Sequence, residues 1–272
     1  MVSEAGVGPN ILLAVKQVPD VSELRLDPVT HSLLREGVPS VLNPYDRYAL
    51  EAGLRLKEIH GGRLTVVSMG PPQARKALQE SLALGADEAV LLTDRAFAAA
   101  DTWATAYTLS VFAKTIPFNM VLTGLKAIDG ETSQVGAELA EFLDIPHASY
   151  VRKIDLRGDM QGVTIERQLE NGYDVWELPL PCLLMVAKEF GQPRLATLQG
   201  YIRAKRQKIR ILTAHDLEAL GANSAYFGLK GSPTFIPKVS PPPAKPPGTI
   251  WSGDPKESVR KLVDALSREG FV

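Results

Sequence analysis

The sequence predicts an α/β protein with a doubly wound, mainly parallel sheet, followed by an extended C-terminal arm and a helix. Two observations carry this prediction. Short apolar runs alternate with helical patterns in the first half of the chain, which is typical of repeated β–α units and a parallel sheet. Near residue 221 the composition becomes rich in proline, which cannot build a regular core element. We therefore expect an α/β domain over residues 1–220 and an arm with a helix over residues 221–272.

Five apolar runs predict strands that are buried on both faces: Asn10–Val15, Arg63–Met69, Glu88–Thr93, Asn119–Gly124 and His147–Val151. The helical patterns between them carry end signals. Asn43 is a good N-cap before Pro44, Gly85 is a good C-cap, and Asp101 is a second N-cap candidate. Further along, Asn171–Gly172 predicts a hairpin turn. A basic helix over residues 200–209 and a capped helix over residues 254–270 complete the expected elements.

Composition excludes several classes of function. The 272 residues carry a net charge of −1, which removes the usual electrostatic reason to expect nucleic-acid or anionic-membrane binding. A single cysteine, Cys182, allows neither an internal disulfide nor a cysteine metal cluster, and we expect it in the core. The four histidines lack metal-ligand spacing, so no metal site is expected. No apolar run reaches the roughly 18 residues of a membrane span, and the first residues resemble no signal peptide. We expect a cytoplasmic protein without direct membrane insertion.

The ends of the first four predicted strands point to one ligand site. They read "AVKQVPD", "SMGPP", "LLTD" and "LTGLKAIDG". In a doubly wound sheet these carboxyl ends meet at one edge, where ligands bind near the switch point. Helix N-termini at this edge suit phosphate groups, because their first turn has unpaired N–H donors and a positive dipole end.

The loop "LTGLKAIDGETSQVG" carries the strongest signal. We expect Gly124 and Gly130 to let the backbone approach a ligand closely, and Lys126 to add a positive charge. Asp129 and Glu131 would repel a phosphate, so one of them is expected to accept a ribose hydroxyl or to cap the helix. On this loop alone, a plain capped helix is an equally good interpretation, because Asp-Gly before a helix is ordinary turn chemistry.

Four segments together resemble the beta subunit of electron transfer flavoprotein: "AVKQVPD", "NPYDRYALEAGLRLKE", "KAIDGETSQVGAELAEFLDIP" and "QPRLATLQGYIRAKRQKI". The resemblance runs in order from about Ile11 to the C-terminal helix. It implies a Rossmann-like, adenine-nucleotide-binding domain whose loop holds the nucleotide pyrophosphate. It also implies a heterodimer in which the arm and last helix pack on an alpha subunit.

The resemblance bears on which nucleotide is held. One-flavin members of the family carry AMP and typically read A-I-D-D-D-x-N-Q-T-G, whereas residues 127–136 here read A-I-D-G-E-T-S-Q-V-G. This pattern resembles the electron-bifurcating branch, in which the beta subunit holds a second FAD. Gly130 in place of the second Asp removes a carboxylate beside the phosphates. By resemblance, this FAD takes a hydride from NADH. One electron then passes through the alpha-subunit FAD to a dehydrogenase or quinone reductase, and one to ferredoxin or flavodoxin.

The site residues follow from the strand ends and the resemblance. No catalytic acid, base or nucleophile is expected on this chain. Pro193–Arg206 matches the family's recognition loop for an acyl-CoA dehydrogenase or the ETF-quinone oxidoreductase, with partner docking by Leu198, Arg203 and Arg206. Arg167–Gln168 departs from the family's Arg-Glu pair, so Gln168 is not given the role of that Glu. The expected cofactor-binding residues are Ala14, Val15, Lys16, Asn43, Ser68, Met69, Gly70, Thr93, Asp101, Thr102, Thr105, Gly124, Lys126, Ala127, Asp129, Gly130, Glu131, Thr132, Ser133, Gln134 and Val135.

Two alternatives remain open at this point. The first is a non-bifurcating beta subunit with structural AMP, which shuttles electrons from acyl-CoA dehydrogenases. The second is a nucleotide-sensing protein on the same fold without redox chemistry. The "PRLATL" segment and the long arm argue against the sensor, which needs neither.

Overall fold

The computed structural model describes residues 8–20, 25–26, 33–34, 39–235 and 247–272. The chain divides into two compact units, residues 1–235 and residues 236–272. The sequence placed the start of the arm at residue 221, but residues 221–235 belong to the first unit. Phe227 is buried there with its ring 5.0 Å from that of Phe97, and Thr234 hydrogen-bonds to Asp101. Most of the proline-rich stretch, residues 236–246, lies outside the described residues.

In the described part of the first unit, nine strands form one sheet in the order β11-β10-β9-β12-β8-β1-β6-β7-β13. Neighbours from β9 to β13 are parallel, while β10 and β11 are antiparallel at one edge. The predicted α/β class with a mainly parallel sheet is therefore confirmed. The strands are β1 (Asn10–Ala14), β6 (Arg63–Met69), β7 (Glu88–Leu92), β8 (Met120–Gly124), β9 (His147–Leu156), β10 (Gly162–Leu169), β11 (Gly172–Pro179), β12 (Cys182–Val186) and β13 (Arg210–Leu212).

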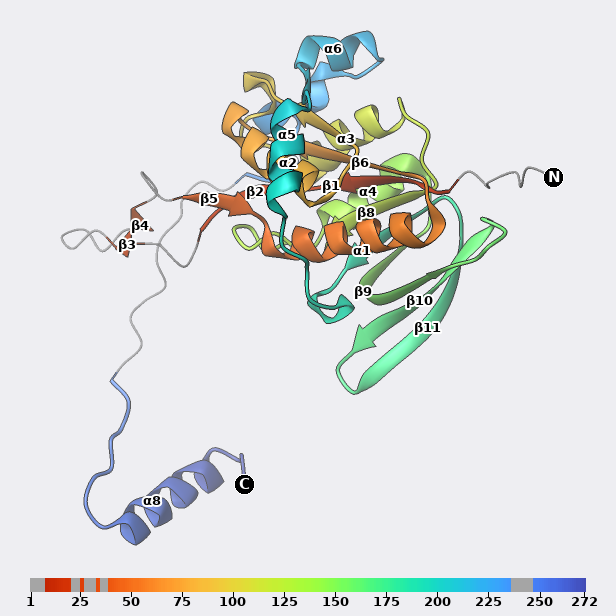
Figure 1. The fold of residues 1–272 in the computed structure, drawn as a ribbon. Helices are drawn as coiled ribbons and strands as arrows, with labels where there is room; N and C mark the ends of the chain where they lie inside the picture. The colour runs from red at the N-terminus through yellow and green to blue at the C-terminus, as the bar shows by residue number, and fades with distance from the viewer. Residues whose placement is uncertain (1–7, 21–24, 27–32, 35–38, 236–246) are drawn as a thin grey trace. The chain divides into compact units, whose positions relative to one another are not determined.

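Helices cover both faces of this sheet (Figure 1). The apolar side chains of α1 (Pro44–His60) and α2 (Arg75–Leu84) pack with one face, and those of α3 (Thr102–Ala113) and α4 (Val135–Leu143) pack with the other. Because successive strand residues point to opposite faces, Leu12 and Leu13 of β1 enter different core clusters. The remaining helices are α5 (Leu198–Arg206), α6 (Ala214–Ala219), α7 (Gly228–Gly231) and α8 (Pro255–Arg268), with 3₁₀ turns η2 (Pro72–Ala74), η3 (Arg95–Phe97), η4 (Lys188–Phe190) and η5 (Ser224–Tyr226).

The strand order creates a switch point beside β1. The chain runs from β1 to β6 and β7 on one side, and then returns to β8 on the other side of β1. Ligands of open α/β sheets bind in the crevice outside the carboxyl ends at such a point. Between β1 and α1, two short antiparallel ladders pair β2 (Gln17–Pro19) with β5 (Ser40–Leu42) and β3 (Arg25–Leu26) with β4 (Leu33–Leu34).

β9 differs from its prediction. It continues to Leu156 and is buried on one face only, with His147 and Tyr150 exposed. The reason is its position, because β9 joins the parallel strands to the antiparallel hairpin and so has solvent on one side. A register shift opposite Leu184–Val186 accompanies a φ of 59° at Tyr150. The predicted hairpin turn between β10 and β11 and the buried Cys182 are both found.

The second unit contains one described helix, α8. Asp254 caps it by accepting a hydrogen bond from the backbone N–H of Glu257 at 3.1 Å. Its apolar residues Val259, Leu262 and Val263 are all exposed. None of the described helices combines the length and apolar character needed to cross a membrane.

Candidate functional site

The end of β1 is tied to the start of α1 by a buried carboxyl group. The backbone N–H of Lys16 donates to Oδ2 of Asp46 at 2.7 Å, and the backbone of Gly124 at the end of β8 also bonds to this carboxyl. Asp46 is buried, and this burial raises its pKa to about 7 against the opposing effect of these hydrogen bonds. Asp46 therefore joins both sides of the switch point, a role that its sequence position did not reveal.

Asn43 tethers the loop after β8 instead of capping α1. The sequence predicted a side-chain N-cap, but the Asn43 side chain makes no cap hydrogen bond. Its Nδ2 donates to the carbonyl of Lys126 at 2.9 Å, and its Oδ1 accepts from the N–H of Ile128 at 3.3 Å. Asn43 is only 1% exposed, so these bonds satisfy a buried amide. This residue fixes the backbone of the loop over residues 125–134.

Two ion pairs cross this loop. Lys16 Nζ lies 2.8 Å from Asp129, and Lys126 Nζ lies 2.9 Å from Glu131. The hydrogen bond that Lys126 donates to Glu131 raises the pKa of Lys126. Neither acid caps α4, contrary to one of the expectations, because each is engaged by a lysine. Exposed pairs of this kind contribute little to stability, so both lysines can exchange a carboxylate for a ligand phosphate at low cost.

The start of α4 offers backbone donors. Gln134 occupies its N-cap position without a side-chain cap bond. Glu131 and Ser133 have φ values of 51° and 55°, which non-glycine residues adopt infrequently. Backbones that alternate between right- and left-handed conformations gather N–H groups into anion-binding concavities. The loop and the first turn of α4 together can therefore receive a phosphate.

Helix α3 begins beside α4. The Thr102 hydroxyl donates to Glu138 at 3.0 Å and lies 3.5 Å from Oε1 of Gln134. Burial raises the pKa of Glu138, and the other oxygen of this carboxyl is buried without a partner in the described structure. Two buried hydroxyls at strand ends, Ser68 on β6 and Thr123 on β8, likewise lack a hydrogen-bond partner among the described residues. Unpaired buried polar groups of this kind are infrequent in proteins and fit a site that a polar ligand completes.

Two glycines near the site are required by packing within the protein. A Cβ on Gly124 would lie 2.7 Å from the backbone carbon of Tyr45, and one on Gly136 would lie 2.8 Å from Met185 and Thr123. Both glycines thus serve close packing within the protein, and the expected role of Gly124 in ligand approach is not needed to explain it. A Cβ on Gly130 would meet nothing within 4 Å, so this exposed residue leaves open space above the loop.

Other expected residues have structural partners. The carboxylate of Asp101 caps α3 by accepting from Ala104 at 3.0 Å and is also bound by Thr234 through its hydroxyl and backbone N–H. These bonds outweigh burial and lower the pKa of Asp101. The remaining members of the expected set lie in three places. Five are at or just after strand ends, two are in the loop, and two are in the first turns of helices: Ala14, Val15, Met69, Gly70 and Thr93; Ala127 and Thr132; Thr105 of α3 and Val135 of α4.

The expected docking residues lie on α5. Leu198 is its first residue and is 76% exposed, and Leu195 just before it is 84% exposed. Arg203 donates to the carbonyl of Leu82 at 3.2 Å, so its guanidinium binds the end of α2. Arg206 is exposed at the end of the helix. The exposed apolar surface at this place is thus wider than the expected docking set, which did not include Leu195.

The Arg167–Gln168 pair lies on β10 at the antiparallel edge. Arg167 packs over the Trp176 ring at 4.0 Å and donates to the carbonyl of Ser149 at 3.1 Å. Gln168 accepts from Arg152 at 3.2 Å. Both side chains therefore have partners within this chain.

Comparison with known proteins agrees with this architecture. A sequence profile described as the electron transfer flavoprotein domain matches residues 30–217. A beta subunit of electron transfer flavoprotein from Thermoanaerobacterium thermosaccharolyticum is 50% identical over 259 residues, covering 95% of this chain and 98% of the relative. The caffeyl-CoA reductase–Etf complex subunit CarD of Acetobacterium woodii is 45% identical, covering 96% and 99%. Protein FixA of Bradyrhizobium diazoefficiens is 40% identical, covering 94% and 90%.

Proposed function

The chain belongs to the electron transfer flavoprotein family as a beta subunit, and from this premise we propose that it binds FAD at the carboxyl edge of its sheet. The observation that carries the proposal is the organised loop over residues 125–134, which precedes a helix without a side-chain cap. A loop that is tethered by a buried amide but leaves its helix donors unused is arranged for an anionic ligand.

The residues present fit an adenine dinucleotide. The first turn of α4 and the loop backbone would hold the pyrophosphate, and Lys16 and Lys126 would turn toward it from Asp129 and Glu131. The unpartnered hydroxyl of Ser68 would serve the nucleoside end. The open space above Gly130 supports FAD over the smaller AMP, because it leaves room for a ligand that continues past one phosphate.

When bound, FAD supplies the redox chemistry, namely acceptance of a hydride from NADH and delivery of single electrons to two acceptors. This chain would bind the nucleotide, orient it through Asn43 and α4, and set its electrostatic surroundings through the two lysines. No acid or base of the chain is assigned a proton transfer.

We propose that the working unit is a heterodimer with an alpha subunit in the cytoplasm. One acceptor path would run through an alpha-subunit FAD to an acyl-CoA dehydrogenase or a quinone reductase, and the other to ferredoxin or flavodoxin. The relative named as a subunit of a caffeyl-CoA reductase–Etf complex supports a partner that acts on CoA thioesters. The exposed apolar residues of α8 support a contact with the alpha subunit.

The decisive experiment measures nucleotide content. The heterodimer, co-expressed with its alpha subunit, is denatured, and the released FAD and AMP are quantified by chromatography. Two FAD and no AMP per heterodimer are expected. One FAD with one AMP would instead make the protein a simple electron shuttle and would refute the reading of Gly130.

A further inference from the structure

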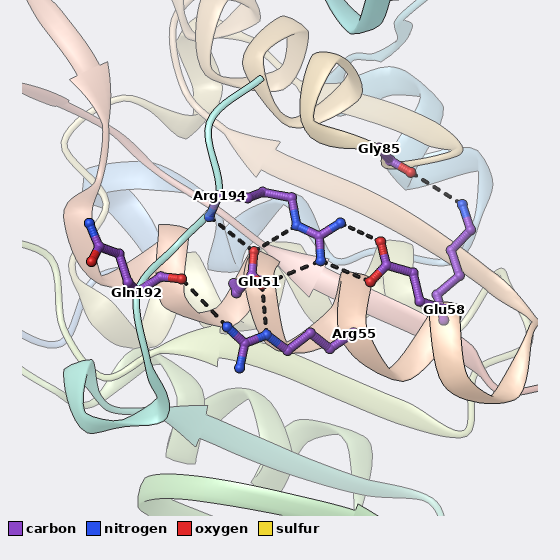
Figure 2. Close-up of polar contacts among 7 residues, drawn as sticks. Glu51, Arg55, Glu58, Gly85, Gln192 and Arg194 are labelled. Carbon is purple, nitrogen blue, oxygen red and sulfur yellow. Dashed lines mark hydrogen bonds and ion pairs between the residues drawn. The ribbon is translucent and has the colours of Figure 1, made fainter. Parts of the chain in front are cut away.

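Arg194 forms a clamp between the segment that carries the exposed leucines and helix α1 (Figure 2). Its Nε donates to Oε2 of Glu51 at 2.8 Å, and its Nη2 donates to Oε2 of Glu58 at 2.9 Å. Its Nη1 bonds to the other oxygen of Glu58, and its backbone N–H donates to Glu51 at 3.1 Å. One residue thus binds two carboxylates that lie two turns apart on α1.

Glu51 is the centre of this clamp. Its side chain is 5% exposed and also accepts a hydrogen bond from Arg55 Nε at 2.7 Å. Burial alone would raise its pKa, but the bonds from Arg194 and Arg55 outweigh burial and lower the pKa of Glu51. Arg55 also packs over the Phe190 ring at 5.5 Å, which holds the preceding 3₁₀ turn to the same helix. Paired, charge-assisted bonds of this kind fix geometry as well as energy.

The clamp lies where the chain has no regular structure. Residues 191–197 connect η4 to α5 without helix or strand, and Leu195 and Leu198 project into solvent on either side of Thr197, the N-cap of α5. Downstream, α5 is held to α2, because Gly200 fits against the carbonyl of Ala83. Upstream, Arg194 binds α1 just before the leucines, Arg55 donates a longer bond to the carbonyl of Gln192 at 3.5 Å, and Ala196 packs against the core between the two leucines.

We propose that Arg194 and Glu51 are positioning residues for docking, which hold the segment 191–198 in the conformation that a dehydrogenase partner binds. The inference rests on the proposed docking role of Leu198. Glu51 is too deeply buried to touch a partner, so it can act on docking only through the two arginines that it binds, Arg194 and Arg55.

With the clamp, the segment 191–198 is already ordered in the folded protein, so the entropic cost of ordering it does not reduce the affinity for the partner. Without the clamp, only a fraction of molecules would present the leucines correctly. The apparent dissociation constant equals the intrinsic constant divided by that fraction. A competent fraction of about one tenth would therefore raise KM for the partner about tenfold. Once docked, the complex is the same, so kcat should stay within about twofold.

The test uses the heterodimer with its bound nucleotides and a purified acyl-CoA dehydrogenase, chosen beforehand as the one that exchanges electrons with the wild type fastest. Arg194→Ala, Glu51→Ala and the double variant are compared for KM and kcat. Each single variant should raise KM by up to about tenfold. The rise in the double variant should fall well short of the product of the two single effects, because both residues act on the same segment. Additive effects would overturn the proposal, because they would mean that Arg194 contacts the partner directly.

Two further variants serve as controls. Arg63→Gln removes an Arg–Glu pair between β6 and β7 and should leave KM unchanged. Arg194→Lys keeps the positive charge but cannot form the bidentate bonds of the guanidinium to the carboxylates, so it should raise KM about threefold. An Arg194→Lys value equal to the wild type would show that charge alone suffices and would refute the clamp.

Hydrogen exchange separates this inference from the proposed function. The amide of Arg194 should exchange at least tenfold faster in Glu51→Ala than in the wild type, with no partner present. Unchanged exchange would refute the clamp itself. Faster exchange with an unchanged KM would refute its role in docking. If Leu198→Ala also left KM unchanged, the proposed docking role of the whole segment would be refuted as well.

Discussion

Replacing Asn43 by alanine should disorder the nucleotide loop while leaving the sheet intact. The side chain is 1% exposed and makes two bonds to the loop, a donated bond to the Lys126 carbonyl at 2.9 Å and an accepted bond from the Ile128 N–H at 3.3 Å. Alanine removes both bonds and leaves α1 with its Pro44 start and no lost cap, since Asn43 does not cap the helix.

The magnitude follows from those two bonds. Each intramolecular hydrogen bond contributes about 0.5–1.5 kcal/mol net, so about 1–3 kcal/mol of loop order is lost. Lys126 and Ile128 are half-buried, so water can reach the freed groups and the larger penalty for a fully buried orphan does not apply. If nucleotide binding must restore the order, the dissociation constant should rise roughly 5- to 150-fold.

The assay is a fluorescence titration of the nucleotide-depleted heterodimer with FAD. Asn119→Ala is the matched control, because Asn119 also accepts a backbone bond, from Asn10 at 2.8 Å, but at the opposite edge of the sheet. Its FAD affinity should equal that of the wild type. Asn43→Asp should bind more weakly than Asn43→Ala, because its carboxylate would face both the Lys126 carbonyl and the buried carboxyl of Asp46, to which the Asn43 side chain is hydrogen-bonded. Wild-type affinity in Asn43→Ala would refute the tether.

Three further predictions concern charge, pH and assembly. Gly130→Ala should retain FAD, because a Cβ at this position meets nothing within 4 Å. Gly130→Asp should lower the FAD content through its charge alone. The released FAD is measured in both variants, and equal losses would contradict this prediction. Because the pKa of Asp46 is raised, the folded state binds more protons than the unfolded state between about pH 4 and 7. The free energy of unfolding should therefore fall as the pH rises through this window. The slope should reach at most about 1.4 kcal/mol per pH unit. Urea titrations of Asp46→Asn should lack that slope, and an unchanged slope would assign it to another group. Truncation after Phe235 should keep the first unit folded, because it spares Thr234 and its bond to Asp101. It should weaken heterodimer formation, because it removes α8. An intact heterodimer in size-exclusion chromatography would count against the role of the arm in assembly.

Local patterns along the chain were sufficient to predict most strands of the sheet and the edge at which their carboxyl ends meet, but not the short strand β13. Buried strands, helix caps such as Gly85 and Asp254, and the alternation of β and α elements depend on neighbouring residues, so the sequence displays them. The convergence of Lys16, Asn43 and the loop after β8 followed from the rule that parallel strands end at one edge. The antiparallel extension of β9 did not follow, because its single buried face depends on which strands lie beside it.

Side-chain roles that depend on distant partners could not be predicted. Asn43 has the sequence signature of a helix cap, but its partners are 83 and 85 residues away. Asp46 has the ordinary appearance of an acid in a first helical turn, and only the fold shows it to be buried. Asp101 caps α3 as predicted, but its second bond, from Thr234 133 residues away, could not be read from the sequence. For Asn43 and Asp46, burial removes the side chain from water and the fold supplies remote partners for its polar atoms.

Helix α1 gives the two proposed sites a common frame. Its N-terminal turn holds the nucleotide loop through Asn43 and Asp46, and its middle holds the docking segment through Glu51 and Glu58. At 1.5 Å per residue, Asn43 and Glu51 lie about 12 Å apart along the axis. A packed helix has little freedom to stretch, so the separation between the nucleotide loop and the docking segment is set by α1 and not by the loops themselves. Loosening either attachment should therefore affect one site without the other, which is why FAD affinity should respond to Asn43→Ala and partner KM to Glu51→Ala, with no exchange of effects between them.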